Sequence, residues 1–132
     1  MKLKFLSFFL FVGILAGCSI DDSDPSCFYQ AAMTTTAVTG PATVVVNTVV
    51  TYDVTFYVAN GCGTFNSLQS SNGFPKSIVA LVDYSGCNCP EVASYVTKPY
   101  TFTPTAAGTY EFRFLTDNPD TPIVKTLTVK AQ

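Results

Sequence analysis

The chain lacks histidine and tryptophan altogether, and it carries few charges. Its 132 residues include no His, no Trp, 7 basic side chains and 9 acidic ones. Without His there is no imidazole base for a Ser or Cys nucleophile and no His ligand for a metal. A net charge of −2 provides no basic field for nucleic acid. We therefore expect no triad chemistry, no cofactor and no nucleic-acid partner.

The chain also lacks an apolar run long enough for a transmembrane helix. The apolar run at 5–16 has twelve residues and follows Lys2 and Lys4, whereas a membrane span needs about 20. A short run after a basic start is typical of a cleaved secretory signal. The run ends in Leu-Ala-Gly-Cys at 15–18, which resembles a bacterial lipobox. The resemblance implies a signal peptide at 1–17 and a lipid-anchored Cys18, the alternative being an ordinary signal peptide with a chance Cys.

Residues 18–26 are predicted to form an acidic tether between the lipid and the folded domain. This segment contains Asp21, Asp22 and Asp24 and ends near Pro25, a composition typical of solvated linkers. Its acids resemble the export signal of surface lipoproteins of the Bacteroidota type. That resemblance implies an outer-membrane protein that faces outward. A charged spacer with no sorting role is the alternative.

The remaining chain, 27–132, has the composition and periodicity of a β domain. Thr occupies 18 and Val 14 of the 115 positions from 18 onward, against 4 Leu and 2 Glu, which favours strands over helices. Apolar side chains alternate with polar ones over 50–58. Turn signals separate eight expected strands, at 29–38, 42–46, 49–58, 63–70, 76–85, 98–103, 109–116 and 122–130. Seven to eight short strands predict an immunoglobulin-like β-sandwich.

One motif near the C-terminus resembles the tyrosine corner of immunoglobulin-like domains. Ala106, Gly108, Tyr110 and Phe112 occupy alternate positions, with Ala106 at the usual acidic position and Phe112 in place of the usual Cys. The resemblance implies that the Tyr110 hydroxyl bonds to the backbone a few residues upstream. Phe112 cannot form the inter-sheet disulfide, so an antibody-type domain is not expected.

Four cysteines remain after Cys18, and we expect them to form two disulfides. An even count in an exported chain favours disulfides, and a bridge between Cys87 and Cys89 would need a strained ring. Two pairings stay open, each joining Cys27 and Cys62 to the Cys-Asn-Cys segment at 87–89. Antiparallel strand directions predict that all four meet at one pole. A four-thiolate metal site and a redox Cys-x-Cys motif are the alternatives.

Taken together, the motifs of the chain resemble those of small bacterial surface lipoproteins with an immunoglobulin-like body. These motifs are the lipobox, the glycine-flanked Cys62, the segment at 86–89 and the Gly-Thr-Tyr-x-Phe motif at 108–112. The resemblance implies a location in the cell envelope and a fold, and it brings no activity with it. We therefore predict a lipid-anchored binding or scaffolding module that is not an enzyme, with an envelope protein or a glycan as partner.

Carbohydrate binding is the specific alternative to scaffolding. Exposed aromatic rings would be needed, and Tyr57, Tyr84 and Tyr95 are the candidates, with Phe74 as a further one; the absence of Trp weighs against this function. The carboxylates, among them Asp53, Asp83 and Glu111, are interpreted as surface charge. The turn at 117–120 offers three oxygen side chains to calcium, but its composition is also that of a simple loop. We therefore assign no metal site.

Overall fold

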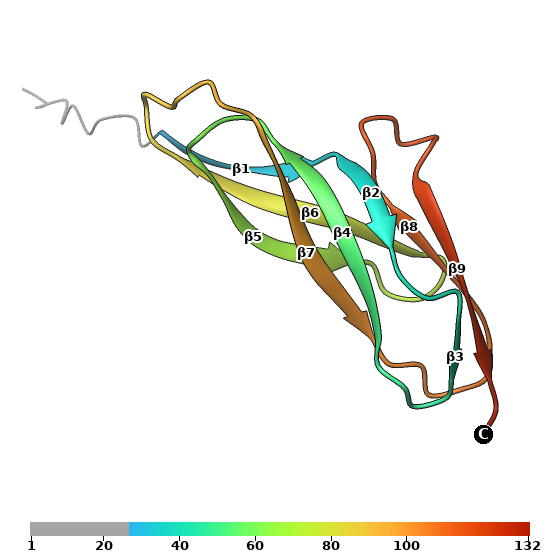
Figure 1. The fold of residues 1–132 in the computed structure, drawn as a ribbon. Helices are drawn as coiled ribbons and strands as arrows, with labels where there is room; N and C mark the ends of the chain where they lie inside the picture. The colour runs from blue at the N-terminus through green and yellow to red at the C-terminus, as the bar shows by residue number, and fades with distance from the viewer. Residues whose placement is uncertain (1–26) are drawn as a thin grey trace, which may run out of the picture.

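In a computed structural model, which describes residues 27–132, the chain forms an elongated two-layer β structure (Figure 1). The described residues contain nine strands and no helix. The strands are β1 (Phe28–Met33), β2 (Thr35–Thr39), β3 (Thr43–Val45), β4 (Val50–Val58), β5 (Gly63–Ser70), β6 (Lys76–Ser85), β7 (Ser94–Phe102), β8 (Gly108–Phe114) and β9 (Ile123–Lys130). The prediction of an all-β sandwich is confirmed.

Strand β6 organises the larger sheet, which has the order β1-β6-β8-β9-β3 with β5 also on β6. Strand β5 pairs with one edge of β6, and both β1 and β8 pair with the other edge. Strand β1 lies along residues 80–85 of β6 and β8 along residues 76–78, so the two follow one another end to end. The smaller sheet has the order β2-β4-β7.

Two strand pairs are parallel, β6 with β8 and β3 with β9. The sheets of an immunoglobulin sandwich are described as antiparallel, so the pairing of β6 with β8 departs from that pattern. The immunoglobulin-like subtype stays a prediction. One element of it is confirmed locally, because the Tyr110 hydroxyl donates a hydrogen bond of 2.8 Å to the Ala106 carbonyl.

The expected strand at 29–38 is wrong in one respect, since it is two strands in different sheets. The Thr35 N–H donates to the Leu115 carbonyl, and the Leu115 N–H donates to the Ile78 carbonyl. The end of β8 therefore occupies the edge of β6 that β1 would otherwise continue along, and the chain crosses to the smaller sheet at Thr34. Strand β7 also begins four residues earlier than the predicted 98.

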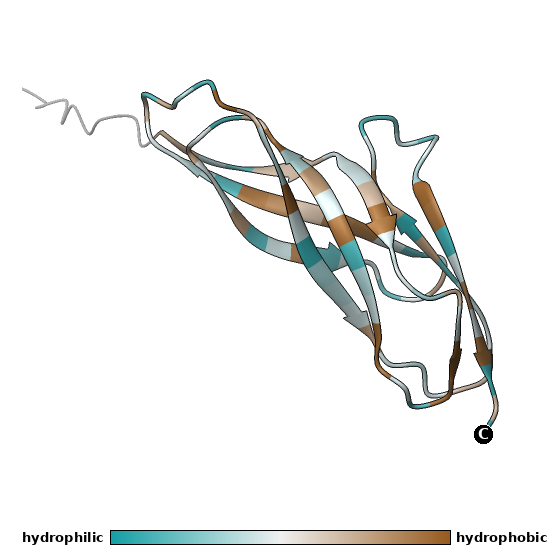
Figure 2. Cartoon of the chain, viewed as in Figure 1, coloured by the Kyte–Doolittle hydropathy of each residue, from teal (hydrophilic) through white to brown (hydrophobic). Residues whose placement is uncertain are grey.

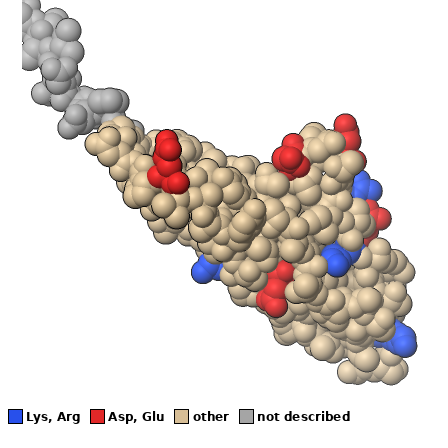
Figure 3. Space-filling model, turned by 45° about the horizontal axis from the view of Figure 1, so that its top comes forward, with Lys and Arg blue, Asp and Glu red and all other residues tan. Residues whose placement is uncertain are grey.

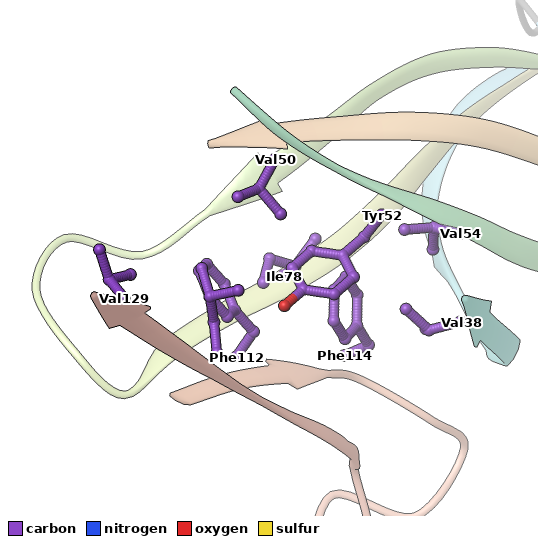
Figure 4. Packing of buried hydrophobic residues seen from close by; sticks show 9 residues of the cluster. Val38, Val50, Tyr52, Val54, Ile78, Phe112, Phe114 and Val129 are labelled. Carbon is purple, nitrogen blue, oxygen red and sulfur yellow. The ribbon is translucent and has the colours of Figure 1, made fainter. Parts of the chain in front are cut away.

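The core lies between the sheets, and its residues alternate along each strand. Apolar and polar residues follow one another along β4 (Figure 2), whose burial also alternates. Tyr52 is fully buried, its ring centroid 5.3 Å from that of Phe112 and 5.9 Å from that of Phe114 (Figure 4). Its hydroxyl donates a hydrogen bond of 3.2 Å to the Pro41 carbonyl, and burial raises the pKa of this hydroxyl. A second buried cluster, which includes Phe56, Val82 and Tyr84, fills the half of the sandwich near Cys27.

Candidate functional site

All four described cysteines gather at the end of the molecule where β1 begins, which we name the disulfide pole. Cys27 pairs with Cys87 across a Cα separation of 5.0 Å, and Cys62 pairs with Cys89 across 5.4 Å. The prediction of two disulfides at one pole is confirmed, and of the two open pairings this one is realised. The C-terminus lies at the opposite end of the molecule (Figure 1).

A glycine next to Cys87 leaves room for the Cys62–Cys89 disulfide. Gly86 has a φ of +133°, and a Cβ at this position would lie 3.0 Å from the Cys62 Sγ and 3.7 Å from the Cys89 Sγ. The Gly86 N–H donates a hydrogen bond of 2.8 Å to the Cys27 carbonyl, which links the Cys27–Cys87 disulfide to the end of β6. The pole is thus covalently fastened to β1, β6 and the loop between β4 and β5.

Tyr57 and Tyr95 form an exposed aromatic pair on the outer face of the smaller sheet, close to the disulfide pole. They are directly opposed partners of β4 and β7, and their ring centroids lie 5.8 Å apart in an edge-to-face arrangement. Tyr95 is 68% exposed and Tyr57 is half-buried. Directly opposed residues of an antiparallel pair share a face. The structure therefore brings together two of the three predicted ligand-binding tyrosines.

The third predicted ligand-binding residue, Tyr84, is a core residue, and the prediction for it is wrong. Only 2% of its surface is exposed. Its hydroxyl accepts a hydrogen bond of 2.9 Å from the Ala59 N–H and contacts the Met33 Sδ at 3.5 Å. A ligand cannot stack on a ring whose faces are covered. Phe74, the further candidate, packs against Phe102 and Tyr110 at the opposite end of the sandwich but keeps 44% of its surface exposed.

Asp83 and Glu111 lie on the outer face of the larger sheet and bind neighbouring side chains, whereas Asp53 lies in the smaller sheet. Asp83 accepts a hydrogen bond of 2.7 Å from the Asn66 amide and one of 2.8 Å from the Gln30 amide. These two bonds, that of Asn66 first, lower the pKa of Asp83. Glu111 binds the Arg113 Nε at 2.6 Å. Asp53 is exposed on β4 in the other sheet.

The loop between β8 and β9 is fixed by its own side chains. The Thr116 Oγ1 donates toward the carbonyls of Asn118 and Thr121, at 2.9 and 3.0 Å. The Asn118 Oδ1 accepts 3.0 Å from the Asp120 N–H, so this oxygen serves the turn itself. Among residues 27–132, no group of three or more His, Cys, Asp or Glu is placed to hold a metal ion.

Sequence reasoning missed a depression of about 490 Å³ beside this loop. Arg113 and Asp120 line it together with apolar walls. Among the described residues, Arg113 pairs with Glu111 and not with Asp120, so the two opposite charges that line the depression do not bind each other. The depression is lined by Ser77, Arg113, Leu115, Pro119, Asp120, Pro122 and Val124. The depression could not be predicted from the sequence, because it depends on the register of β6, β8 and β9. This register aligns Ser77, Arg113 and Val124.

Charged side chains are scattered across the surface. Figure 3 shows, on the face it presents, separated acidic and basic groups with no large patch of one sign. No helix among residues 27–132 is long and apolar enough to cross a membrane. Cys18, the predicted signal peptide at 1–17 and the tether at 18–26 lie outside the described residues.

The fold and these surfaces define a disulfide-braced β-sandwich with an exposed tyrosine pair. A scan against protein-family models and searches of curated proteins and of solved structures return no match.

Proposed function

We propose that the chain is a lipid-anchored protein of a bacterial cell envelope that acts as a binding or scaffolding module, without catalysis. The observation that carries the proposal is the pair of disulfides at one pole. Disulfides persist in oxidising compartments and are rare in the cytosol. An exported chain whose sequence also resembles a lipobox at 15–18 fits a lipoprotein facing the periplasm or the cell exterior.

The anchor is tested by mass spectrometry of the intact processed protein. We expect a mass that lacks residues 1–17 and includes a diacylglycerol on the Cys18 sulfur and an acyl chain on its amine. The Cys18→Ser variant should lose both lipids. Alkylation without reductant should label no cysteine of the body. A purified chain that retains its leader, or whose body thiols all react, would contradict the envelope assignment.

A carbohydrate-binding role is the second candidate, and the tyrosine pair favours it. Tyr95 exposes two thirds of its surface beside Tyr57, and exposed aromatic rings are an apolar platform with a polar tip. On a glycan array, Tyr95→Ala and Tyr57→Ala should each lose binding, whereas Phe28→Ala, which removes a comparably exposed ring from the other sheet, should retain it. Capture of one envelope protein in place of glycans would favour scaffolding.

A further inference from the structure

The open edges of the two sheets differ in how they are protected against pairing with another chain. Native proteins block such edges with short strands, bulges, proline or inward-pointing charge. Strand β3 has 3 residues, and β2 and β5 each carry a register shift. Strand β7 contains Pro99, and its inward Lys98 lies 5.2 Å from the Phe65 ring centroid. Strand β1, with the sequence FYQAAM, has no proline, no charge and no register shift.

The backbone of β1 presents a regular set of hydrogen-bonding groups on its outer edge. The Cys27 carbonyl accepts from the Gly86 N–H, so odd-numbered residues of β1 exchange bonds with β6. Because the pattern alternates along an antiparallel ladder, Phe28, Gln30 and Ala32 direct their N–H and C=O groups away from β6. No other described strand pairs with this edge. Six backbone groups are therefore available in register.

The core-facing side of β1 is incompletely covered. Tyr29 stacks on Tyr84 with ring centroids 4.8 Å apart, so it points to the same side as the core residue. Yet 54% of Tyr29 is exposed, although Ala31 and Met33 on the same side are partly buried. Phe28, on the opposite side of the strand, is 57% exposed. A strand added beside β1 would bury part of both rings.

We propose that β1 pairs in antiparallel fashion with β1 of a second copy of this chain, with Gln30 opposite Gln30 on a twofold axis. In this register Phe28 lies opposite Ala32, so all six outward backbone groups form hydrogen bonds. Tyr29 lies opposite Ala31 on the core-facing side. Each large side chain therefore meets a small one, on both faces of the joined sheet. A twofold contact requires such a self-complementary surface.

Electrostatics also permits two copies to meet at this edge. The body from 27 to 132 contains 5 basic and 6 acidic residues, a net charge of −1. Among the described residues, the charge directly opposite the centre of β1 is Asp83, which pairs with Gln30 across β1 and β6. In the dimer three strand spacings, about 14 Å, would separate the two Asp83 side chains. This distance exceeds the Debye length of about 8 Å at physiological salt.

Site-specific cross-linking of the full-length chain tests the register. Directly opposed residues of a hydrogen-bonded antiparallel pair have Cα atoms about 5.5 Å apart, within the range that a disulfide bridges. Gln30→Cys should therefore yield a covalent dimer on mild oxidation. Ala32→Cys is the matched control, because the two copies of residue 32 would lie about 14 Å apart along the strands. Peptide mapping should confirm that the two native disulfides are intact in both variants.

Equal cross-linking of the two variants, cross-linking of Ala32→Cys alone, or none at all would overturn the proposal. Gln30→Pro provides a second measurement that needs no new thiol. It removes an outward N–H and the side-chain bond to Asp83, and it leaves the backbone bonds of β1 to β6 in place, as proline on an edge strand can. Sedimentation should report about half the mass of the unmodified protein. Gln30→Ala, which loses the same side-chain bond to Asp83 but keeps the outward N–H, should keep the full mass. An unmodified chain that sediments as a monomer at every protein concentration measured would also overturn the proposal.

Discussion

Thr35 stands where the chain passes from one sheet to the other, and its hydroxyl carries an uncompensated cost. The residue is 2% exposed, and its Oγ1 has no hydrogen-bond partner among the described residues. Burying a hydroxyl without a partner costs roughly 1–3 kcal/mol. We expect Thr35→Val to raise the free energy of unfolding by about 1 kcal/mol, measured by urea denaturation at constant m-value. Thr36→Val is the control, because the Thr36 hydroxyl donates to the Thr55 carbonyl, and it should give no gain.

Asp83 makes folding stability depend on pH in the acidic range. Hydrogen bonds from Asn66 and then Gln30 lower its pKa in the folded state below the unfolded value of about 3.9. The stabilisation is therefore complete above the unfolded pKa and is lost as the pH falls through the folded pKa. A carbon-detected NMR titration should show the lowered pKa. Asn66→Ala should raise it more than Gln30→Ala, and the reverse order would contradict this account.

Residue-level prediction from the sequence succeeded where the chemistry is local. Cysteine parity in an exported chain predicts two disulfides, and the structure has them. It failed for Tyr84, because Val79 and Leu81 on the other face of β6 are also apolar, so the sequence of this strand does not show which face is buried. Gln30 and Asn66 could not be identified as partners of Asp83, because they reach it from two other strands.

The tyrosine corner links the loop at 103–107 to β8. Tyr110 donates 2.8 Å to the Ala106 carbonyl, and its ring lies 5.5 Å from that of Phe102 on β7. Tyr110→Phe keeps the ring and removes the bond, so we expect a loss of about 1 kcal/mol in unfolding free energy. Tyr100→Phe, which removes a hydroxyl without this contact, should cost less. Thermal unfolding followed by circular dichroism distinguishes them, and equal losses would contradict a role for the corner.

Element boundaries followed from the sequence where turn signals flank a strand, and failed where a neighbour intervenes or the alternation is disturbed. Strands β5 and β6 match the predicted 63–70 and 76–85. The break at Thr34 depends on Leu115, about eighty residues away, which no local pattern contains. In β7, Pro99 and the inward Lys98 disturb the alternation. Both are tolerated because β7 is an edge strand.

On the scale of the whole molecule, the disulfides compensate for a sandwich with several open edges. Cys27 and Cys87 are 60 residues apart in sequence, and Cys62 and Cys89 are 27 apart. If the constraint acts on the unfolded chain, loops of these sizes are worth about 4 and about 3.5 kcal/mol. Both disulfides also hold the same short segment, 87–89, which follows β6. Removal of one disulfide leaves this segment held by the other, so removal of the second should release more structure than removal of the first.

This coupling predicts how paired cysteine replacements behave. Cys27→Ser with Cys87→Ser, and Cys62→Ser with Cys89→Ser, should each lower the unfolding free energy by about 3 to 4 kcal/mol. Removing all four cysteines should cost more than the sum of the two pairs, because contacts at a shared segment are not independent. Denaturant titration measures all three variants, and hydrogen exchange should locate the additional opening at 86–90. A strictly additive loss, with no change in exchange there, would show that each disulfide acts on its own loop.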